Sequence, residues 1–557
     1  MCANGLAEAA LKPVLPDYIA GLPRLLKSWI APNFNAFRRD RLSLLWLLSL
    51  LIGIGVALAA IAFREAIGLV QLLWLGDRSE RVLSAAREVP PYVIFLAPVV
   101  GGLVVGLLLH YLMPSKRTQG VADVIEARAM SGRPIGFREG LLSSIITAIS
   151  LGSGGSAGRE GPVVHLGATL ASGIARHLSL PEWSRRTLLG AGVAAAVSAS
   201  FNAPIAGVLF AHEVILGHYA MRAFVPIVIS STVAGVLSRV YFGDAAAFML
   251  PAYGITSYWE FPAFALLGVV SALVAIGFQF TLFSADFLAR RMTVPLWTRP
   301  VIGGAAIGLI GMVLPHVLGV GYEVTDLALW GQLPLVLMLV LIVAKTITTA
   351  ITLASRFGGG IFSPALYLGA LTGGAFGIVA AALFPDLASS RSLYAILGMG
   401  AVAGAVLGAP ISTTVIVFEL TGGYALSVAL LLCVAIAHGI NHALHGHSYF
   451  QWQLASRGIF VQEGPHQTLR HAIKVMDFMT PIEPDSEGSF DREKQPDALK
   501  SSDTLERALR LFDQGGHSRL PVLDEKSGTT LIAWASQVQA LEYYNARLVA
   551  ASEEEHR

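Results

Sequence analysis

The sequence predicts an all-α membrane protein that crosses the bilayer many times, followed by a small α/β domain. Of its 557 residues, 54% are hydrophobic and only 14% are charged, and the mean hydropathy is +0.63. So much apolar surface does not fit inside a soluble fold of this size. A polar tail from about residue 457 predicts the second domain, and a glycine-rich motif that occurs twice indicates an internal repeat.

Residues 1–40 precede the first span and are expected to form a cytoplasmic segment. Basic residues gather just before that span, at Lys27, Arg38, Arg39 and Arg41. By the positive-inside rule they place the N-terminus in the cytoplasm. Residues 1–30 carry no signal-peptide pattern, so a plasma or bacterial inner membrane is the expected location. The net charge is only +2, and no basic domain indicates a nucleic acid partner.

A membrane domain is expected over residues 41–456. Five apolar segments are long enough for the hydrocarbon core, which takes about 20 residues to cross. They are Ser43–Phe63, Tyr92–Met113, Phe261–Leu282, Leu333–Ile351 and Ala425–Ile440. Other apolar segments are shorter or interrupted by glycine and proline. Broken helices are tolerated only where protein or water satisfies the freed backbone groups, so we expect function there.

The tail, residues 457–557, begins a different kind of structure, with both termini of the chain expected in the cytoplasm. Ile482–Lys500 is rich in charged residues, serine and proline, as in a solvated loop. Asp503, with Glu506 three residues on, indicates a helix start. Ser518–Asp524 and Leu531–Ser536 are typical of short strands joined by a turn.

Two halves of the membrane domain, about 41–250 and 258–456, carry the same pattern. Gly158, Pro162, Gly167 and Ala168 recur with the same spacing as Gly360, Pro364, Gly369 and Ala370. Further on, nine residues separate Pro204 from Glu213, and nine separate Pro410 from Glu419. Duplicated transporter folds have such halves and bind their substrate between them. Small-residue runs such as Gly190–Ala199 are interpreted as sites of close helix packing.

Gly158–Pro162 and Gly358–Pro364 indicate helices that begin inside the membrane. A helix start presents unpaired N–H groups and the positive end of its dipole, and therefore favours an anion. Glu160 places a carboxylate where that anion would bind, so its protonation can couple anion passage to pH. The alternative role for Glu160 is a salt bridge with Arg159.

A divalent-cation transporter is the alternative from another class, with Glu160, Glu213 and Glu419 as ligands. Carboxylates this sparse make a poor cage for such a cation. Gly152–Gly154 lacks the full spacing of a nucleotide-binding turn, and no metal site is expected from the histidines near residue 440. Cys2 and Cys433 indicate no disulfide. No nucleophile and base stand at plausible spacing, so the protein is not expected to be an enzyme.

Three motifs together resemble the CLC chloride channel and transporter family: Gly158–Pro162, Phe201–Gly207 and Gly360–Pro364. The resemblance implies a homodimer with one anion pathway per subunit, and an inverted repeat of tilted and broken helices in each subunit. It implies that Glu160 is the gate, that the N–H groups of Ile361 and Phe362 bind chloride, and that the Tyr449 hydroxyl closes the inner side. The full anion-binding set that it implies is Gln119, Gly120, Arg159, Glu160, Gly161, Gly360, Ile361, Phe362 and Tyr449.

Three departures from the family pattern bear on function. Gln119 stands where the family usually has a serine that donates to the anion, so anion selectivity is open; the Gln119 amide or Thr118 are the candidate donors. Val214, after Glu213, stands where antiporters commonly carry an inner proton glutamate, which favours passive conduction over chloride/proton exchange. His212 or water is the candidate replacement. The tail resembles a single CBS module, about residues 474–545, with an adenine nucleotide as its candidate ligand.

Overall fold

The structure, a computed structural model, describes most of the chain. The described residues are 28–31, 34, 35, 37, 41–78, 81–129, 135–243, 248, 254–421, 426–459, 469, 470, 473–482, 497–525 and 530–556. The predicted segment 1–40 and the polar loop Ile482–Lys500 fall mostly outside these ranges, and Cys2 falls outside them entirely.

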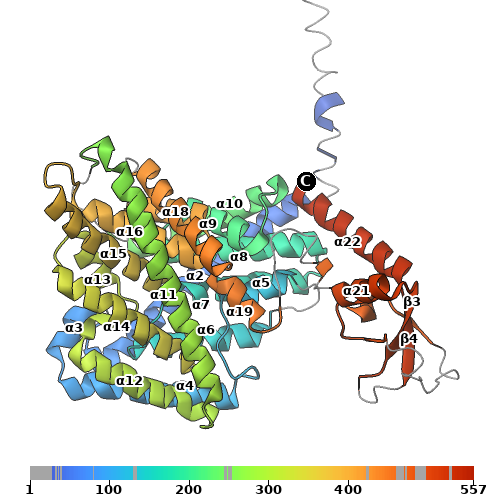
Figure 1. Ribbon diagram of the computed structural model, residues 1–557, viewed down its shortest axis with the longest axis horizontal. Coiled ribbons are helices and arrows are strands. Elements are labelled where there is room, and N and C mark those ends of the chain that lie inside the picture. The colour runs from blue at the N-terminus through green and yellow to red at the C-terminus, as the bar shows by residue number, and fades with distance from the viewer. Residues whose placement is uncertain are drawn as a thin grey trace, which may run out of the picture.

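A helical domain takes up the chain from Leu42 to Ala455 (Figure 1). Its first half contains α2 (Leu42–Leu75), α3 (Val82–Glu88), α4 (Pro91–Tyr111), α5 (Val121–Ala129), α6 (Phe137–Gly152), α7 (Glu160–His177), α8 (Glu182–Phe201), α9 (Pro204–Phe210) with a π-helical continuation (Ala211–Leu216), and α10 (Met221–Phe242). Its second half contains α11 (Phe261–Arg291), α12 (Arg299–Val313), α13 (Tyr322–Leu329), α14 (Leu335–Ala354), α15 (Phe362–Leu383), α16 (Arg391–Leu407), α17 (Pro410–Thr421), α18 (Ser427–His445) and α19 (Tyr449–Ala455). Short 3-10 turns precede α11, α12 and α13, at Tyr258–Glu260, Leu296–Thr298 and Pro315–Val317.

Each of the five predicted spans corresponds to a helix, namely α2, α4, α11, α14 and α18. Among the described residues, eight helical segments are long and apolar enough to cross a membrane. The three that the sequence analysis left out are Met221–Phe242, Leu296–Val313 and Phe362–Leu383. Glycine and proline interrupt their apolar pattern, as Pro226 does inside α10. In a helix packed against others, such residues are tolerated because neighbours satisfy the freed backbone groups.

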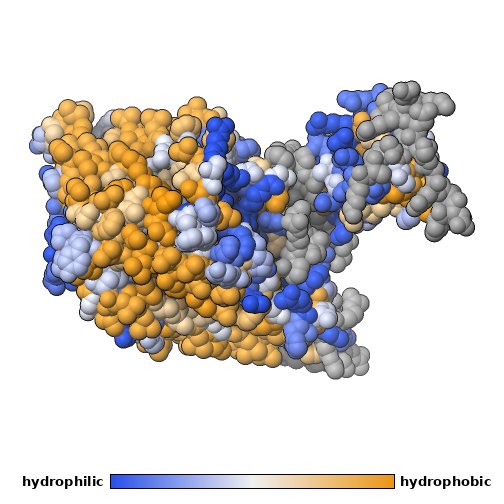
Figure 2. All heavy atoms as spheres, turned by 90° about the horizontal axis from the view of Figure 1, so that it is seen from below, coloured by the Kyte–Doolittle hydropathy of each residue, from blue (hydrophilic) through white to orange (hydrophobic). Residues whose placement is uncertain are grey.

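Apolar side chains cover most of the surface of the helical domain that Figure 2 presents. Leu58, Phe280 and Val343 are each more than half exposed. Soluble proteins rarely expose apolar patches of such extent. The protein is therefore an integral membrane protein that crosses the bilayer several times.

Small residues bring α7 against α8, and α15 against α16, at close range. A Cβ atom added to Gly167 would lie 2.3 Å from the carbonyl oxygen of Gly192, and one added to Gly369 would lie 2.4 Å from that of Gly398. Only glycine fits at such separations. The close-packing interpretation is confirmed, and the two crossings match in geometry.

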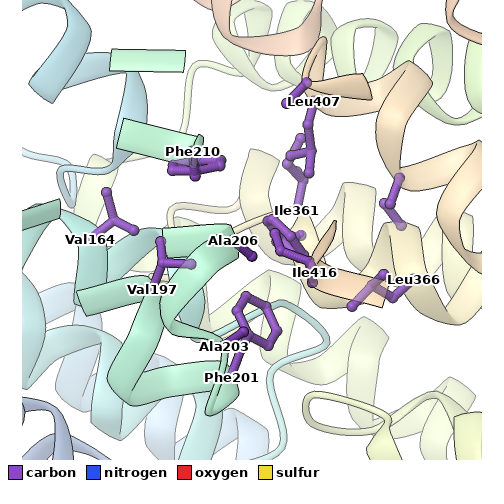
Figure 3. Packing of buried hydrophobic residues seen from close by; sticks show 14 of the residues in the cluster. Val164, Val197, Phe201, Ala203, Ala206, Phe210, Ile361, Leu366, Leu407 and Ile416 are labelled. Carbon is purple, nitrogen blue, oxygen red and sulfur yellow. The ribbon is translucent and has the colours of Figure 1, made fainter. Parts of the chain in front are cut away.

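The two halves share one apolar core. Val164, Val197 and Ala206 of the first half belong to the same buried cluster as Ile361, Leu366 and Ile416 of the second. Figure 3 shows Ala206 near Ile361 and Ile416. Phe201 at the end of α8 and Phe362 at the start of α15 have ring centroids 4.8 Å apart. The broken helix ends of both halves therefore meet in the interior of the domain.

The tail contains a small four-stranded sheet in the order β1-β4-β3-β2, with α21 (Leu505–Gly515) and α22 (Gln537–His556). The strands are β1 (Thr480–Pro481), β2 (Leu499–Lys500), β3 (Arg519–Leu523) and β4 (Leu531–Ser536), and only the β2–β3 pair is parallel. The predicted helix and both predicted strands are confirmed.

The cap of α21 corrects the predicted helix start at Asp503. Thr504 caps α21 by accepting from the N–H of Arg507 at 3.4 Å. The Asp503 carboxylate accepts instead from the N–H of Lys500, at 2.8 Å. The Asp503 carboxylate therefore stabilises the turn that precedes α21, and the hydroxyl of Thr504 takes the N-cap position.

Candidate functional site

Two helix starts from the two halves meet at a pair of glycines. The N–H of Gly158 donates to the carbonyl of Gly360, and the N–H of Gly360 donates to the carbonyl of Gly158, each at 2.7 Å. Directly after these residues, α7 begins at Glu160 and α15 begins at Phe362. The sequence analysis predicted both starts, and the structure confirms them. The unpaired N–H groups and positive dipole ends of the two helices are thereby placed side by side.

Glu160, the first residue of α7, is buried between the two halves, with 2% of its surface exposed. Its Oε1 atom accepts from the hydroxyl of Tyr322 at 2.6 Å and from the hydroxyl of Ser363. Its Oε2 atom has no hydrogen-bond partner. A Cβ atom added to Gly158 would lie 2.7 Å from Oε2, so the carboxylate is packed against the glycine bridge.

A cavity of about 340 Å³ reaches this carboxylate. Eight of the nine residues of the expected anion-binding set line it: Gln119, Gly120, Glu160, Gly161, Gly360, Ile361, Phe362 and Tyr449. The ninth, Arg159, is not part of the lining; its guanidinium lies over the ring of Tyr322, 5.0 Å from the centroid. Arg117, Arg290, Arg356 and Arg457 also line the cavity, together with Asp123 and Asp286. Cationic side chains therefore outnumber carboxylates in the lining of this cavity, which favours an anion.

Tyr449 is held at the wall of this cavity by the start of α19. Ser448 and Gln451 form a capping box there, each side chain accepting from the other residue's backbone N–H. The ring of Tyr449 stacks on that of Phe283 of α11, with centroids 5.5 Å apart and an interplanar angle of 12°. The ring thus lines the cavity, and the role of its hydroxyl toward an anion stays a prediction.

The Gln119 side chain is engaged with α6. Its Nε2 atom donates to Glu139 Oε2 at 3.1 Å, and its backbone N–H donates to the hydroxyl of Ser143 at 2.7 Å. This amide, with Thr118 as the alternative, was named from the sequence as a candidate donor to the anion. One N–H of the amide is used by a carboxylate, because the longer side chain can reach the first turn of α6 where a serine could not. The role of Gln119 toward an anion stays a prediction.

Glu213 and Glu419 each hold a helix start in the other half. The Glu213 carboxylate accepts from the N–H groups of Ile411 and Ser412, at 3.1 and 2.7 Å. The Glu419 carboxylate accepts from the N–H groups of Ile205 and Ala206, also at 3.1 and 2.7 Å. These carboxylates stabilise the starts of α17 and α9. The sequence analysis missed this role, although the matched nine-residue spacing after each proline was a signal for it.

The cation-transport alternative is not favoured by this arrangement. Two of its three proposed ligands are occupied with backbone N–H groups. Within the described ranges, no three His, Cys, Asp or Glu side chains are grouped so that they could hold a metal ion.

His212 and Val214 flank Glu213 on the π-helical segment. His212 is buried; its Nδ1 atom lies 2.8 Å from the carbonyl oxygen of His218, and its Nε2 atom has no hydrogen-bond partner. Val214 packs against the main apolar core and has no group that can exchange a proton. The role of His212 in a proton route stays a prediction.

An ion cluster joins α5 to the end of α19 beside the cavity. Asp123 accepts from Arg117 at 2.5 Å, from Arg457 at 2.8 Å and from the backbone N–H of Gly120 at 2.8 Å. The sequence analysis did not find this cluster, because Arg457 lies 334 residues from Asp123 in the chain. It fixes the cavity wall that carries Gly120.

The fold and the site define a transport protein of the membrane that is built from two repeats around an anion-attracting centre. Residues 101–442 match the family model of the voltage gated chloride channels, so the chain belongs to this family, the CLC proteins. It is 32% identical over 414 residues to a putative ClcB-like chloride channel protein of Ralstonia nicotianae, covering 73% of this chain and 95% of the relative. It is 29% identical over 415 residues to the voltage-gated ClC-type chloride channel ClcB of Escherichia coli, covering 73% of this chain and 98% of that protein.

Solved structures share the fold. A slow cyanobacterial Cl⁻/H⁺ antiporter matches with a TM-score of 0.66 at 22% identity, over 74% of this chain and 97% of its own. A CLC-type fluoride/proton antiporter matches with a TM-score of 0.62 at 24% identity, over 74% and 98%. A eukaryotic CLC transporter matches with a TM-score of 0.65 at 18% identity, over 91% of this chain and 89% of its own. The CLC fold predicted from the motifs is confirmed.

Proposed function

We propose that the protein carries chloride or a related small anion through a pathway within each subunit, and that Glu160 gates this pathway. The observation that carries the proposal is the position of the Glu160 carboxylate, at the meeting point of α7 and α15 and on the wall of the cavity. There it competes with an anion for the same helix starts. Protonation would remove its charge and free the site.

Passive conduction is the mode that we favour, because Val214 cannot carry a proton at the inner end of the usual route. Chloride/proton exchange is the second candidate. It is supported by the buried, unpartnered Nε2 atom of His212 and by the description of two structural neighbours as antiporters. In either mode the protein moves an ion and catalyses no reaction.

Chloride efflux from proteoliposomes, with the external pH recorded at the same time, tests the proposal. The proteins to compare are the wild type, Glu160→Gln, and Glu88→Gln, which makes the same change at an exposed position on α3. We expect chloride efflux without proton movement in the wild type, faster efflux in Glu160→Gln, and wild-type behaviour in Glu88→Gln. Proton uptake that is driven by the chloride gradient and lost in Glu160→Gln would establish exchange. Absence of chloride flux in all three proteins would contradict the proposal.

The assembly and the tail complete the proposal. We propose that the protein is a homodimer in a plasma or bacterial inner membrane, with both termini in the cytoplasm. Exposed apolar residues on adjoining helices, among them Ile205, Ile411 and Val428, are available for a subunit contact. We propose that the tail is a single CBS-like module with an adenine nucleotide as its candidate ligand. The mass of the detergent-solubilised protein and a nucleotide titration test these two statements.

A further inference from the structure

Two hydroxyl groups from the second half of the protein donate to the carboxylate of the proposed gate, Glu160. Tyr322, the first residue of α13, donates from its hydroxyl to Glu160 Oε1 at 2.6 Å. Ser363, in the first turn of α15, donates to the same oxygen atom. Hydrogen bonds to a charged acceptor are roughly twice as strong as bonds between neutral groups. Both donors therefore hold the carboxylate in the position where it blocks the proposed anion site.

The ring of Tyr322 is held from two sides. The guanidinium of Arg159 lies 5.0 Å from its centroid, and the ring of Phe248 meets it edge to face with centroids 5.6 Å apart. Neither contact uses the hydroxyl. The ring can therefore keep its place if the hydroxyl alone is removed.

The backbone that presents Tyr322 is fixed by a buried lysine. Lys345 of α14 is fully buried, and its Nζ atom donates to the carbonyl groups of Val317 and Gly319, at 3.1 and 2.9 Å. Gly321, directly before Tyr322, has a φ of 96°, a conformation that favours glycine. On the other side of α13, Glu323 accepts from the backbone N–H of Ser84 in α3 at 3.1 Å. A supported backbone of this kind holds a side chain to a narrow range of positions.

We propose that Tyr322 is a positioning residue that holds Glu160 in its blocking position, so that the Tyr322 hydroxyl sets how readily the pathway opens. The inference rests on the proposed gating role of Glu160 and adds to it a second residue from the other repeat. Removing the hydroxyl leaves Ser363 as the remaining side-chain donor at Oε1. The carboxylate then leaves the site more easily, and anion flux rises.

Tyr322→Phe is the test variant, and Tyr367→Phe is its matched control. Tyr367 is buried and also lies in the second half, but its hydroxyl donates to the carbonyl of His316, at 3.3 Å. Each change is made in the wild type and in Glu160→Gln, and the initial rate of chloride efflux is measured in proteoliposomes at about pH 7.5, where a free glutamate is ionised. Thermal unfolding of each protein in detergent shows that it is folded.

We expect Tyr322→Phe to raise the efflux rate by up to about tenfold, equivalent to about 1.4 kcal/mol. In the Glu160→Gln background we expect the same change to have no effect, because a positioning residue acts only through the group that it positions. Tyr367→Phe should leave the rate unchanged in both backgrounds. Tyr322→Met also lacks the hydroxyl and is expected to raise the rate likewise. It replaces Tyr322→Phe as the test variant if Tyr322→Phe does not fold.

Two results would overturn the role of Tyr322 without touching the gating role of Glu160. One is an unchanged rate in Tyr322→Phe while Glu160→Gln conducts faster than the wild type. The other is an equal change of rate in both backgrounds. A Glu160→Gln protein that conducts as the wild type does would overturn the gate itself, and with it the role of Tyr322.

Discussion

Gly158 and Gly360 join the two halves of the membrane domain by exchanging two backbone hydrogen bonds of 2.7 Å, one in each direction. They lie at equivalent positions of the two repeats, just before the two helix starts. The bridge fixes the separation of these starts without any side chain. Both helix dipoles therefore act on the same small volume.

A side chain at position 158 is expected to disturb the pair of backbone hydrogen bonds between Gly158 and Gly360. In Gly158→Ala, the added Cβ would lie 2.7 Å from Glu160 Oε2 and 3.1 Å from the backbone nitrogen of Ser363. The added atom would displace its nearest neighbours, which belong to Glu160 and to the start of α15. We expect strongly altered chloride flux, measured as efflux from proteoliposomes. Gly277→Ala is the control, because no atom lies within 4 Å of its added Cβ; equal behaviour of the two variants would contradict the prediction.

Glu419 and Glu213 are expected to contribute to stability through the helix starts that they hold. Glu419→Gln replaces a charged acceptor of two N–H groups, those of Ile205 and Ala206, by a neutral amide oxygen. Loss of such bonds typically costs about 1–3 kcal/mol. We expect a lower unfolding temperature in detergent for Glu419→Gln, a similar decrease for Glu213→Gln, and none for Glu88→Gln.

The same variants separate a structural from a proton-carrying role for Glu213. If Glu213 only holds α17, Glu213→Gln changes the unfolding temperature and leaves the ratio of protons to chloride ions in transport unaltered. A changed ratio at an unchanged unfolding temperature would show instead that the carboxylate takes part in proton movement.

Local sequence signals predicted the helix starts at Glu160 and Phe362, because glycine and proline act within a few residues of their own position. The partners of Glu160 were beyond such signals. Tyr322 lies 162 residues away and Ser363 lies 203 residues away, and only the packing of the repeats brings them together. The partners of Glu213 were beyond such signals for a related reason: a carboxylate shows its charge in the sequence, but the N–H groups that donate to it belong to the backbone of the other half.

Asp123 is expected to stabilise the cavity wall at all but strongly acid pH. Burial alone raises the pKa of this carboxyl, but the hydrogen bond and charge of Arg117, with the charge of Arg457 and the N–H of Gly120, outweigh it and lower the pKa to about 2. Because the folded pKa lies below the unfolded value of about 3.9, the stabilisation is present above about pH 4 and is lost as the pH falls toward about 2.

Asp123→Asn tests the ion cluster. At about pH 7 it should lower the free energy of unfolding by about 2 kcal/mol, and the difference from the wild type should shrink below about pH 4. Unfolding is followed in detergent as a function of pH. A difference that stays constant down to about pH 3 would show that the charge of Asp123 is not what stabilises this wall.

Gln119→Ser is expected to change which anions the pathway accepts. In the wild type one N–H of the Gln119 amide donates to Glu139 Oε2 at 3.1 Å, so this donor is not available to the cavity that the residue lines. A serine at this position is too short to reach Glu139 and presents a hydroxyl donor to the cavity instead. An additional donor favours a small anion with a high charge density, so we expect chloride to compete better against a large anion in efflux experiments, by a factor of about 3 to 10. Gln119→Ala removes the amide without adding a donor. If it changed the preference as much as Gln119→Ser does, the effect would come from the size of the site and not from the hydroxyl.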